Sequence, residues 1–308
     1  MNKTTTIVVA ILVLVGALLI WKLPVSENPA DQQTDTATTT APSTATTTAE
    51  NPADEAPVEN PSETKIGSSV EGRDIVAYHY GTGDKEILFV GGIHGGYSWN
   101  TAKVAYELMD YLEDTEDKLP SNIKVTVIPV LNPDGLTKAV GTTADFEAAD
   151  VNASADVRVA SRFNANNVDL NRNFGCDWKA EGMWQSKKVS GGTEAFSEPE
   201  SQAFRSYIES HNPEGVVVWY SSAGGVYASN CHDGVLPETT ALADLYGKAA
   251  GYSVHKEYNF YEITGDMVNW LASKDIPAIS VLLTTHTSTE WTKNRAGIDA
   301  VINFYANR

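Results

Sequence analysis

Hydrophobic and polar positions change their spacing along residues 65–308, and the spacing predicts strands separated by helices. Short, nearly continuous apolar runs are typical of strands buried on both faces of a sheet. Apolar residues three or four positions apart are typical of one buried helix face. Strands are expected at 74–80, 86–90, 123–130, 216–220 and 278–283, and helices at 101–112, from 197, at 237–250, across 267–272 and from about 290.

The alternation of these elements predicts the fold class. Strands that alternate with helices favour an α/β fold, here an α/β/α sandwich around a mixed, mostly parallel sheet. Ligands of such sheets bind beyond the carboxyl ends of the strands, where His94, Asn132 and Ser221 fall. We therefore expect the functional site at that edge.

Local signals refine the connections between the elements. Asn132-Pro133-Asp134-Gly135 is a strong turn signal. Ser197 fits the N-cap of a helix, and Glu200, three residues later, fits the reciprocal position of a capping box. Residues 141–196 are rich in Asn, Gly and Ser, and a loop of that length inside a compact domain is usually functional.

The N-terminal residues differ sharply from the rest of the chain. Residues 4–21 are uncharged and apolar, near the lower limit for crossing a bilayer, and Lys3 and Lys22 flank them. A cleavable signal peptide is the alternative, but Lys22-Leu23-Pro24-Val25 is a poor cleavage site, so we favour an uncleaved anchor for residues 1–23. Either interpretation predicts that the domain is extracytoplasmic, membrane-anchored in the first case and secreted in the second.

Residues 24–64 are rich in Thr, Ala, Pro and acidic residues and contain no Lys or Arg. Such a segment buries too little apolar surface to offset the entropy of ordering, so we expect a disordered linker. One domain of residues 65–308 follows. The sequence thus predicts an anchor or signal segment, a linker and a single globular domain.

Charge and cysteine content restrict the partners and the compartment. The net charge of −18 includes −12 in residues 65–308, which argues against nucleic acid as a partner. Cys176 and Cys231 are the only cysteines, and neither lies in a Cys-x-x-Cys motif. In an oxidising compartment they are expected to form a disulfide.

Several motifs, in this order and at these spacings, resemble the carboxypeptidase A-type zinc peptidases. The resemblance covers nearly all of residues 65–308. The matching stretches are Gly67-Ser68-Ser69-Val70-Glu71-Gly72-Arg73, Gly91-Gly92-Ile93-His94, Asn132-Pro133-Asp134-Gly135, Arg162-Phe163-Asn164, Asp169-Leu170-Asn171-Arg172-Asn173-Phe174, Ser197-Glu198-Pro199-Glu200 and Ser288-Thr289-Glu290-Trp291.

The resemblance implies a zinc ion held by two histidines and a glutamate, with a second glutamate as general base. His94 matches the first ligand. Tyr97 and Ser98 occupy the candidate positions for the acidic ligand, and we place it at Ser98. Ser221 is the most plausible position of the second histidine, and Leu282 stands at the position of the general base.

The substrate-binding side of the resemblance is better preserved. Asn171 and Arg172 match the pair that binds the terminal carboxylate of a substrate, and Arg162 is the candidate for the carbonyl-polarising arginine. Tyr258 or Tyr261 is the candidate for a tyrosine that closes over substrate. Asp266 is the candidate for contact with a cationic group of the ligand.

Catalytic zinc needs three protein ligands and an open position for water, and the sequence supplies one ligand. A positioned general base contributes roughly 10²- to 10⁴-fold, which Leu282 cannot supply. We therefore expect a pseudoenzyme that binds the C-termini of peptides or of cell-wall stem peptides. The resemblance implies zinc as the family's cofactor, but the residues present do not predict a complete zinc site in this chain.

Three alternatives remain open from the sequence. An active carboxypeptidase could use a rearranged metal site, with ligands from His232, Asp233, His286 or Glu290. A structural or adhesive surface module would need a closed pocket. Finally, Arg162, Asn171 and Arg172 could form a charge network with Asp169 or Asp134 that ties down the long loop, instead of binding a carboxylate.

Overall fold

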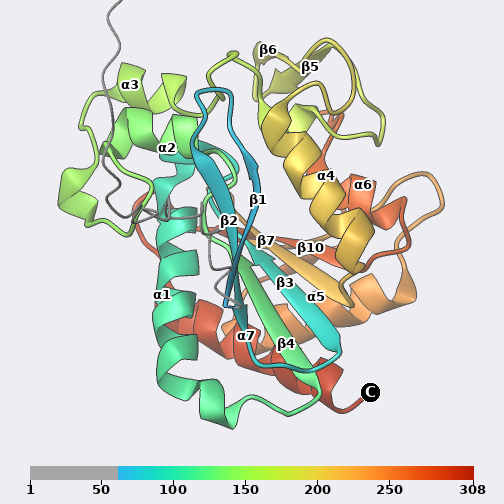
Figure 1. Cartoon of the computed structure of the whole chain (residues 1–308). Helices are drawn as coiled ribbons and strands as arrows, with labels where there is room; N and C mark the ends of the chain where they lie inside the picture. Colours follow the sequence, from blue (N-terminus) through green and yellow to red (C-terminus); the bar gives the residue numbers. More distant parts are fainter. Residues whose placement is uncertain (1–61) are drawn as a thin grey trace, which may run out of the picture. The chain divides into compact units, whose positions relative to one another are not determined.

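The structure is a computed structural model, and it describes residues 62–308. Its main feature is an eight-stranded sheet with the strand order β1-β2-β4-β3-β7-β10-β8-β9 (Figure 1). The strands are β1 (Glu63–Ser68), β2 (Asp74–Tyr80), β3 (Lys85–Val90), β4 (Ile123–Ile128), β7 (Gly215–Ser221), β8 (Gly225–Ala228), β9 (Val254–His255) and β10 (Ala278–Leu283).

The sheet is mixed, as predicted. The central neighbours β4, β3, β7 and β10 run parallel, and so do β8 and β9. The pairs β1–β2, β2–β4 and β8–β10 are antiparallel. Because β3, β7 and β10 are parallel neighbours, their carboxyl ends meet at one edge of the sheet.

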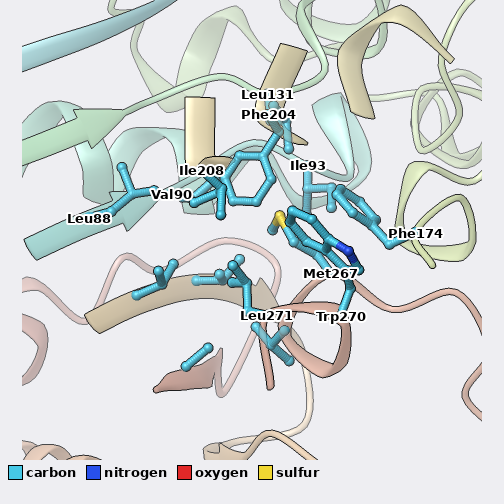
Figure 2. Packing of buried hydrophobic residues seen from close by; sticks show 14 of the residues in the cluster. Leu88, Val90, Ile93, Leu131, Phe174, Phe204, Ile208, Met267, Trp270 and Leu271 are labelled. Carbon is cyan, nitrogen blue, oxygen red and sulfur yellow. The ribbon is translucent and has the colours of Figure 1, made fainter. Parts of the chain in front are cut away.

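Helices cover both faces of the sheet, which confirms the α/β/α sandwich (Figure 1). One face carries α4 (Pro199–His211) and α6 (Met267–Ala272), and the other carries α1 (Trp99–Thr115), α5 (Pro237–Ala250) and α7 (Trp291–Ala306). Alternate strand residues supply the two cores: Leu88 and Val90 face α4 and α6, whereas Ile87 and Phe89 face α1 and α7. Figure 2 shows the first core, where Trp270 and Met267 of α6 pack near Phe174.

Two local expectations were wrong. The residue that caps α4 is Glu198 rather than Ser197, because the side chain of Glu200 is turned away to accept hydrogen bonds from Val70 N and Asn164 Nδ2. The turn expected at 132–135 is the start of a helix, α2 (Pro133–Val140), in which the side chain of Asn132 accepts a hydrogen bond from Gly135 N. A proline at the first helical position suits this start.

The long segment 141–196 contains short elements that the sequence pattern does not reveal. They are α3 (Ala155–Ala160), the hairpin of β5 (Glu181–Trp184) and β6 (Lys187–Ser190), and short 3₁₀ turns that include η4 (Leu170–Arg172). Asn171 and Arg172 of η4 and Trp184 of β5 line the cavity at the carboxyl edge of the sheet. The segment is therefore part of the wall of the site.

Cys176 and Cys231 form a disulfide, as expected. The predicted anchor and nearly all of the predicted linker lie outside the described residues, although β1 already begins at Glu63. Among residues 62–308, none of the helices has the length and apolar character needed to span a bilayer.

Candidate functional site

A cavity of about 340 Å³ opens at the carboxyl edge of β3, β7 and β10. His94 follows β3, Ser221 ends β7 and Leu282 lies near the end of β10, so the strand ends bring together residues far apart in the sequence. Most of the predicted site residues line this cavity, namely His94, Arg162, Asn171, Arg172, Ser221, Tyr258, Tyr261, Asp266, Leu282 and His286.

His94 lies at the start of the 3₁₀ turn η1 (Gly95–Ser98) and is 5% exposed. Burial, together with the nearby charge of Arg162, lowers the pKa of His94 to about 4, so the imidazole is neutral at pH 7. Asp169 Oδ1 lies 3.5 Å from His94 Nε2, but neither ring nitrogen has a hydrogen-bond partner within the described residues. At that distance we regard the contact as electrostatic rather than as a hydrogen bond.

Arg162 forms a buried ion pair with Asp169. Its Nε and Nη2 lie 2.9 and 2.8 Å from Asp169 Oδ2. Burial opposes ionisation of Asp169, but the charge of Arg162, the contact with His94 and the charge of Arg172 together outweigh it and hold the pKa of that carboxyl well below its usual range. The guanidinium also lies over the ring of Trp184, 4.5 Å from its centroid. For Arg162, the charge network considered from the sequence is therefore present.

Arg172 has a different environment. It is 1% exposed, and it donates hydrogen bonds to two backbone oxygens, those of Met183 (2.7 Å from Nη2) and Asn171 (2.5 Å from Nη1). Within residues 62–308, no carboxylate oxygen lies within ion-pair distance of Arg172. A guanidinium has five N–H donors, so some donors of Arg172 remain without a partner. The cavity wall thus contains a buried positive charge that is not neutralised by direct contact.

Asn171 and Asp266 form a hydrogen bond near the guanidinium of Arg172. Asn171 Nδ2 donates to Asp266 Oδ2 at 2.7 Å, and Asn171 Oδ1 accepts from Tyr220 and from Met267 N. Asp266 also caps α6 by accepting from Asn269 N. Burial raises the pKa of Asp266, although these hydrogen bonds and Arg172 act in the opposite direction. Both oxygens of Asp266 therefore have structural partners, in addition to facing the cavity.

Aromatic rings close one side of the cavity. Tyr258 and Tyr261 pack edge to face at 5.2 Å, and Tyr261 lies 5.8 Å from the guanidinium carbon of Arg172. Phe260, which lies between these tyrosines in the sequence, is 63% exposed. Tyr261 is thus the ring that covers the unpaired guanidinium.

Two of the predicted ligand positions, Ser98 and Ser221, have neighbours in the sequence that fit the cavity better. Ser98 does not line the cavity, and its hydroxyl is buried without a hydrogen-bond partner, whereas Tyr97 of the same turn does line it. Ser221 lines the cavity but lies within hydrogen-bond distance of Asn100 and His286, while the ring beside His94 is that of Tyr220. In parallel pairing with β10, Tyr220 is opposite Leu282, so both point to the same side. We therefore propose that Tyr97 and Tyr220, rather than Ser98 and Ser221, stand at the two ligand positions.

The alternative metal ligands considered from the sequence do not converge on His94. His286 Nδ1 lies 2.9 Å from the hydroxyl of Ser221, and Glu290 accepts hydrogen bonds from Thr284 N and Tyr252. His232 contacts Asp177 instead, and neither residue lines the cavity.

The side chains around His94 do not fit a zinc ion. Among the described residues, no group of three His, Cys, Asp or Glu donors that could hold a metal includes His94. Asp169, the nearest carboxylate, is already bound to Arg162, and both nitrogens of His94 are sealed from solvent. Zinc needs at least three such donors.

The sequence indicates Tyr97 only as a candidate position of the acidic ligand, and it does not indicate Trp184 as a component of the site. Both rings contact each other, with 4.9 Å between centroids, and both face Arg162. No local pattern indicates this, because Trp184 belongs to the β5–β6 hairpin, which the composition of the long segment hides. Only the folded chain brings the three side chains together.

Solved structures with this fold include a murein-tripeptide amidase from Escherichia coli O157, with 19% identity and a TM-score of 0.54 over 83% of this chain and 96% of that chain. Another is a carboxypeptidase A from Helicoverpa armigera, with 22% identity and a TM-score of 0.61 over 79% of this chain and 66% of that chain. These likenesses concern the fold.

Among curated proteins, a γ-D-glutamyl-L-diamino acid endopeptidase of Lysinibacillus sphaericus is 23% identical over 64% of this chain, and the match spans 54% of the endopeptidase. Bacteriocin BCN5 of Clostridium perfringens is 24% identical over 75% of this chain, and the match spans only 23% of the bacteriocin. The family model described as zinc carboxypeptidase matches residues 59–307. This match covers all but the last of the described residues, and the chain belongs to the zinc carboxypeptidase family.

Proposed function

We propose that this zinc carboxypeptidase-family domain binds the free C-terminal carboxylate of a peptide and does not hydrolyse the peptide bond. The observation that carries the proposal is Arg172, a buried guanidinium in the cavity wall with no carboxylate of residues 62–308 in ion-pair contact. An unpaired buried charge is costly, and a ligand carboxylate would neutralise it through charge-assisted hydrogen bonds. Asn171 and Arg162 are the neighbouring polar groups that we expect to orient the ligand.

The absence of hydrolysis is inferred from the donor set. His94 lacks companion ligands among residues 62–308, and Leu282 cannot exchange a proton with water. The active alternative, a carboxypeptidase with a rearranged zinc site, has family membership in its favour. Measured zinc content and product release distinguish the two.

The ligand class that we propose is a cell-wall stem peptide. The names of a murein-tripeptide amidase and of a γ-D-glutamyl-L-diamino acid endopeptidase among the related proteins support this class. A free carboxylate is what Arg172 requires in such a peptide. An extracytoplasmic, membrane-anchored or secreted location fits this ligand, and the apolar N-terminal segment and the disulfide support that location.

The direct test compares two forms of one murein tripeptide, the free acid and the C-terminal amide, by calorimetric titration of the full chain. We expect the amide to bind about 10- to 100-fold more weakly, the range for one lost charge-assisted hydrogen-bond pair. The ligand is changed rather than the protein, so folding is not at issue. Equal affinity for the two forms, or no binding of either, would overturn the proposal.

A second measurement addresses hydrolysis. The chain is incubated with excess zinc and desalted, and its zinc content and its release of C-terminal residues from a peptide library are measured. We expect essentially no zinc at the cavity and no release. About one equivalent of zinc together with released residues would establish the active alternative.

A further inference from the structure

The cavity wall contains further polar side chains that the contacts around Arg172 do not use. Ser280 of β10 and Asn269 of α6 both line the cavity. Within residues 62–308, neither the hydroxyl of Ser280 nor Nδ2 of Asn269 has a hydrogen-bond partner. Buried polar groups of a folded protein are normally paired, so these two groups indicate a place for a polar ligand group.

Ser280 is the only polar residue of β10, whose sequence is AISVLL. Alternation along the strand puts its side chain on the same face as Ala278 and Leu282, and Leu282 also lines the cavity. Ser280 is 8% exposed. Because the rest of β10 is apolar, the hydroxyl of Ser280 can find a partner only in the cavity.

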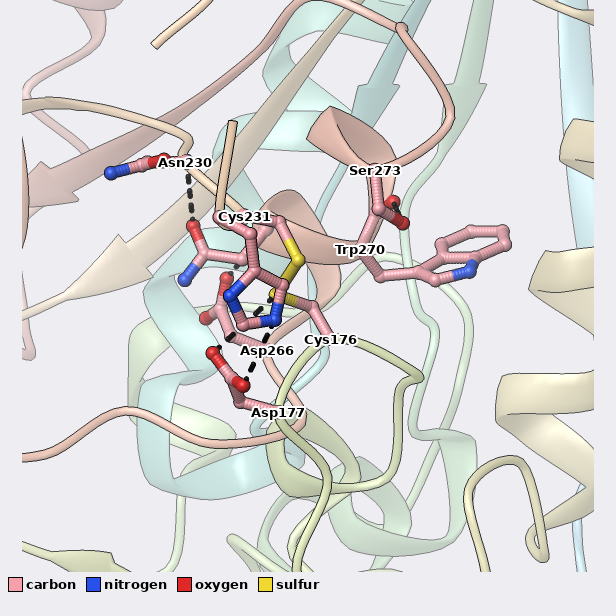
Figure 3. The surroundings of a disulfide bond; sticks show 9 residues. Cys176, Asp177, Asn230, Cys231, Asp266, Trp270 and Ser273 are labelled. Atoms are coloured by element: carbon pink, nitrogen blue, oxygen red, sulfur yellow. Dashed lines mark hydrogen bonds and ion pairs between the residues drawn. A yellow bond between two sulfur atoms is a disulfide. The ribbon is translucent and has the colours of Figure 1, made fainter. Parts of the chain in front are cut away.

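Asn269 is held in one orientation. Its Oδ1 accepts a hydrogen bond from Asn230 N at 3.0 Å, so Nδ2 is the end of the amide that remains free as a donor. Figure 3 shows Asn230 next to the disulfide between Cys176 and Cys231, which fixes the backbone directly after Asn230. The disulfide therefore helps to hold the donor of Asn269 in place.

Asp266 supplies the acceptor of this group. Each of its oxygens already accepts one hydrogen bond, from Asn269 N and from Asn171 Nδ2. A carboxylate has about four lone-pair positions, so Asp266 can accept further hydrogen bonds from a ligand. The hydrogen bond from Asn171 also joins the group to the carboxylate-binding residues, since Arg172 follows Asn171.

We propose that the C-terminal residue of the bound peptide has a side chain whose end both donates and accepts hydrogen bonds, and that Asp266, Asn269 and Ser280 bind this end. The proposal rests on the proposed function, because it requires the terminal carboxylate to lie at Arg172. The side chain of a terminal residue leaves the carbon that carries the carboxyl group, so it is the part of the ligand that reaches the neighbouring Asp266. Two kinds of end have this chemistry: a primary amide, and an amino group next to a carboxyl group.

The same three residues disfavour other side chains. An apolar end would displace water from Ser280 and Asn269 without replacing its hydrogen bonds, which is costly. A carboxylate alone would face the like charge of Asp266. An ammonium group alone would offer no acceptor to the N–H donor of Asn269. An end with both functions satisfies all three residues.

The test titrates the full chain by calorimetry with N-acetyl-alanyl peptides that differ only in their C-terminal residue. One set ends in glutamine, glutamate or methionine, which are similar in length. The other set ends in lysine or in lysine with a carboxyl group added to its ε carbon. In at least one set we expect the end with both functions to bind about 10- to 100-fold more tightly than the rest of its set, the range for buried polar groups left unpaired.

A preference in either set supports the proposal and identifies which of the two ends is bound. Equal affinities within both sets, or tighter binding of the methionine and lysine peptides, would overturn it. The change is made in the ligand, so the folding of the protein is not affected.

Two serine variants test the role of the hydroxyl. Ser280→Ala should weaken binding of the preferred peptide about 3- to 10-fold, as expected for one neutral hydrogen bond, and should leave the methionine peptide unchanged. Ser229→Ala is the matched control, because Ser229 is also buried, its hydroxyl has no partner within residues 62–308, and it does not line the cavity. The control should bind every peptide like the parent chain. No effect of Ser280→Ala, or an equal effect of both variants, would contradict the assignment.

Failure of this proposal differs from failure of the proposed function. If the free acid and the C-terminal amide of one peptide bind equally, or no peptide binds, the carboxylate does not lie at Arg172 and both proposals fail. If the free acid binds more tightly but neither set shows a preference, only the assignment of Asp266, Asn269 and Ser280 fails.

Discussion

The phenol ring of Tyr220 lies against the imidazole of His94, with 5.6 Å between the ring centroids. Its hydroxyl donates to Asn171 Oδ1 at 3.2 Å, and burial raises the pKa of Tyr220 well above its usual value, so the hydroxyl stays protonated. A neutral phenol is a poor substitute for a histidine ligand. Tyr220 therefore fills space beside His94 and supports the carboxylate-binding side of the cavity through Asn171.

This relationship predicts which substitutions would create a metal site. The variant Tyr97→Glu, Tyr220→His and Leu282→Glu places an acid one 3₁₀ turn from His94, a histidine beside it, and a base opposite that histidine on β10. We expect this variant to bind about one equivalent of zinc, because three protein ligands complete a catalytic-type site. Zinc content after desalting is the measurement.

The matched control carries the positions expected from the sequence, namely Ser98→Glu, Ser221→His and Leu282→Glu. Because Ser98 does not line the cavity, we expect this control to hold less than a tenth of an equivalent. If the control bound zinc and the first variant did not, our reassignment of the two ligand positions would be wrong.

The sequence predicts the long regular elements, but it does not show which of two neighbouring side chains in a short turn enters the cavity. Strand and helix positions such as 278–283 and 237–250 agree with β10 and α5, because long apolar patterns report burial directly. The choice between Tyr97 and Ser98 depends on which side chain of a short 3₁₀ turn points inward. Backbone geometry decides that choice, and neighbouring residues of one turn have no periodicity that distinguishes them.

The carboxylate-binding residues illustrate the same limit in another way. The motif around Asn171 and Arg172 identifies both residues, but the motif cannot reveal that Arg162 is paired with Asp169 while Arg172 lacks an acidic partner. Such pairing depends on contacts between residues that are 7 or more positions apart in the sequence. It also depends on the β5–β6 hairpin, in which the carbonyl of Met183 accepts a hydrogen bond from Arg172. Charge pairing of this kind becomes visible only in the folded chain.

His94 should make stability depend on pH. In the unfolded chain its imidazole takes up a proton near pH 6.5, but in the folded protein only near pH 4. Between these values the unfolded state binds more protons, so the free energy of unfolding falls as the pH falls. We expect a loss of about 2 kcal/mol between pH 6.5 and pH 5 from this residue, measured by urea unfolding.

The contribution is isolated by comparison with His94→Gln, whose pH profile should be flatter over the same interval. The buried carboxyls of Asp266 and Glu200, whose raised pKa values give a slope of opposite sign, are present in both proteins and cancel in the difference. Parallel profiles for the chain and His94→Gln would contradict the prediction.

The ion pair between Arg162 and Asp169 should be costly to break from either side. Asp169→Asn leaves a buried guanidinium without its carboxylate, and Arg162→Met leaves a buried carboxylate. Each single change should lower the free energy of unfolding by about 3 to 5 kcal/mol. The double variant should lose clearly less than the sum, because neither charge remains. Chemical unfolding of all four proteins measures this coupling, and simple additivity would show that the pair is not coupled.

Gly265 packs directly against the backbone of Arg172. Gly265 has a φ of +59°, and a Cβ atom added there would lie 2.2 Å from the backbone oxygen of Arg172. Gly265→Ala should therefore add a backbone clash to the cost of a left-handed conformation, which is roughly 1 to 2 kcal/mol for a non-glycine residue. Gly251→Ala is the matched control, since its φ is +72° with no atom within 4 Å of the added Cβ. We expect Gly265→Ala to lose at least about 2 kcal/mol more than Gly251→Ala, and to weaken binding of the tripeptide free acid as Arg172 shifts. Equal losses in the two variants would mean that the approach of Gly265 to Arg172 does not hold the guanidinium in place.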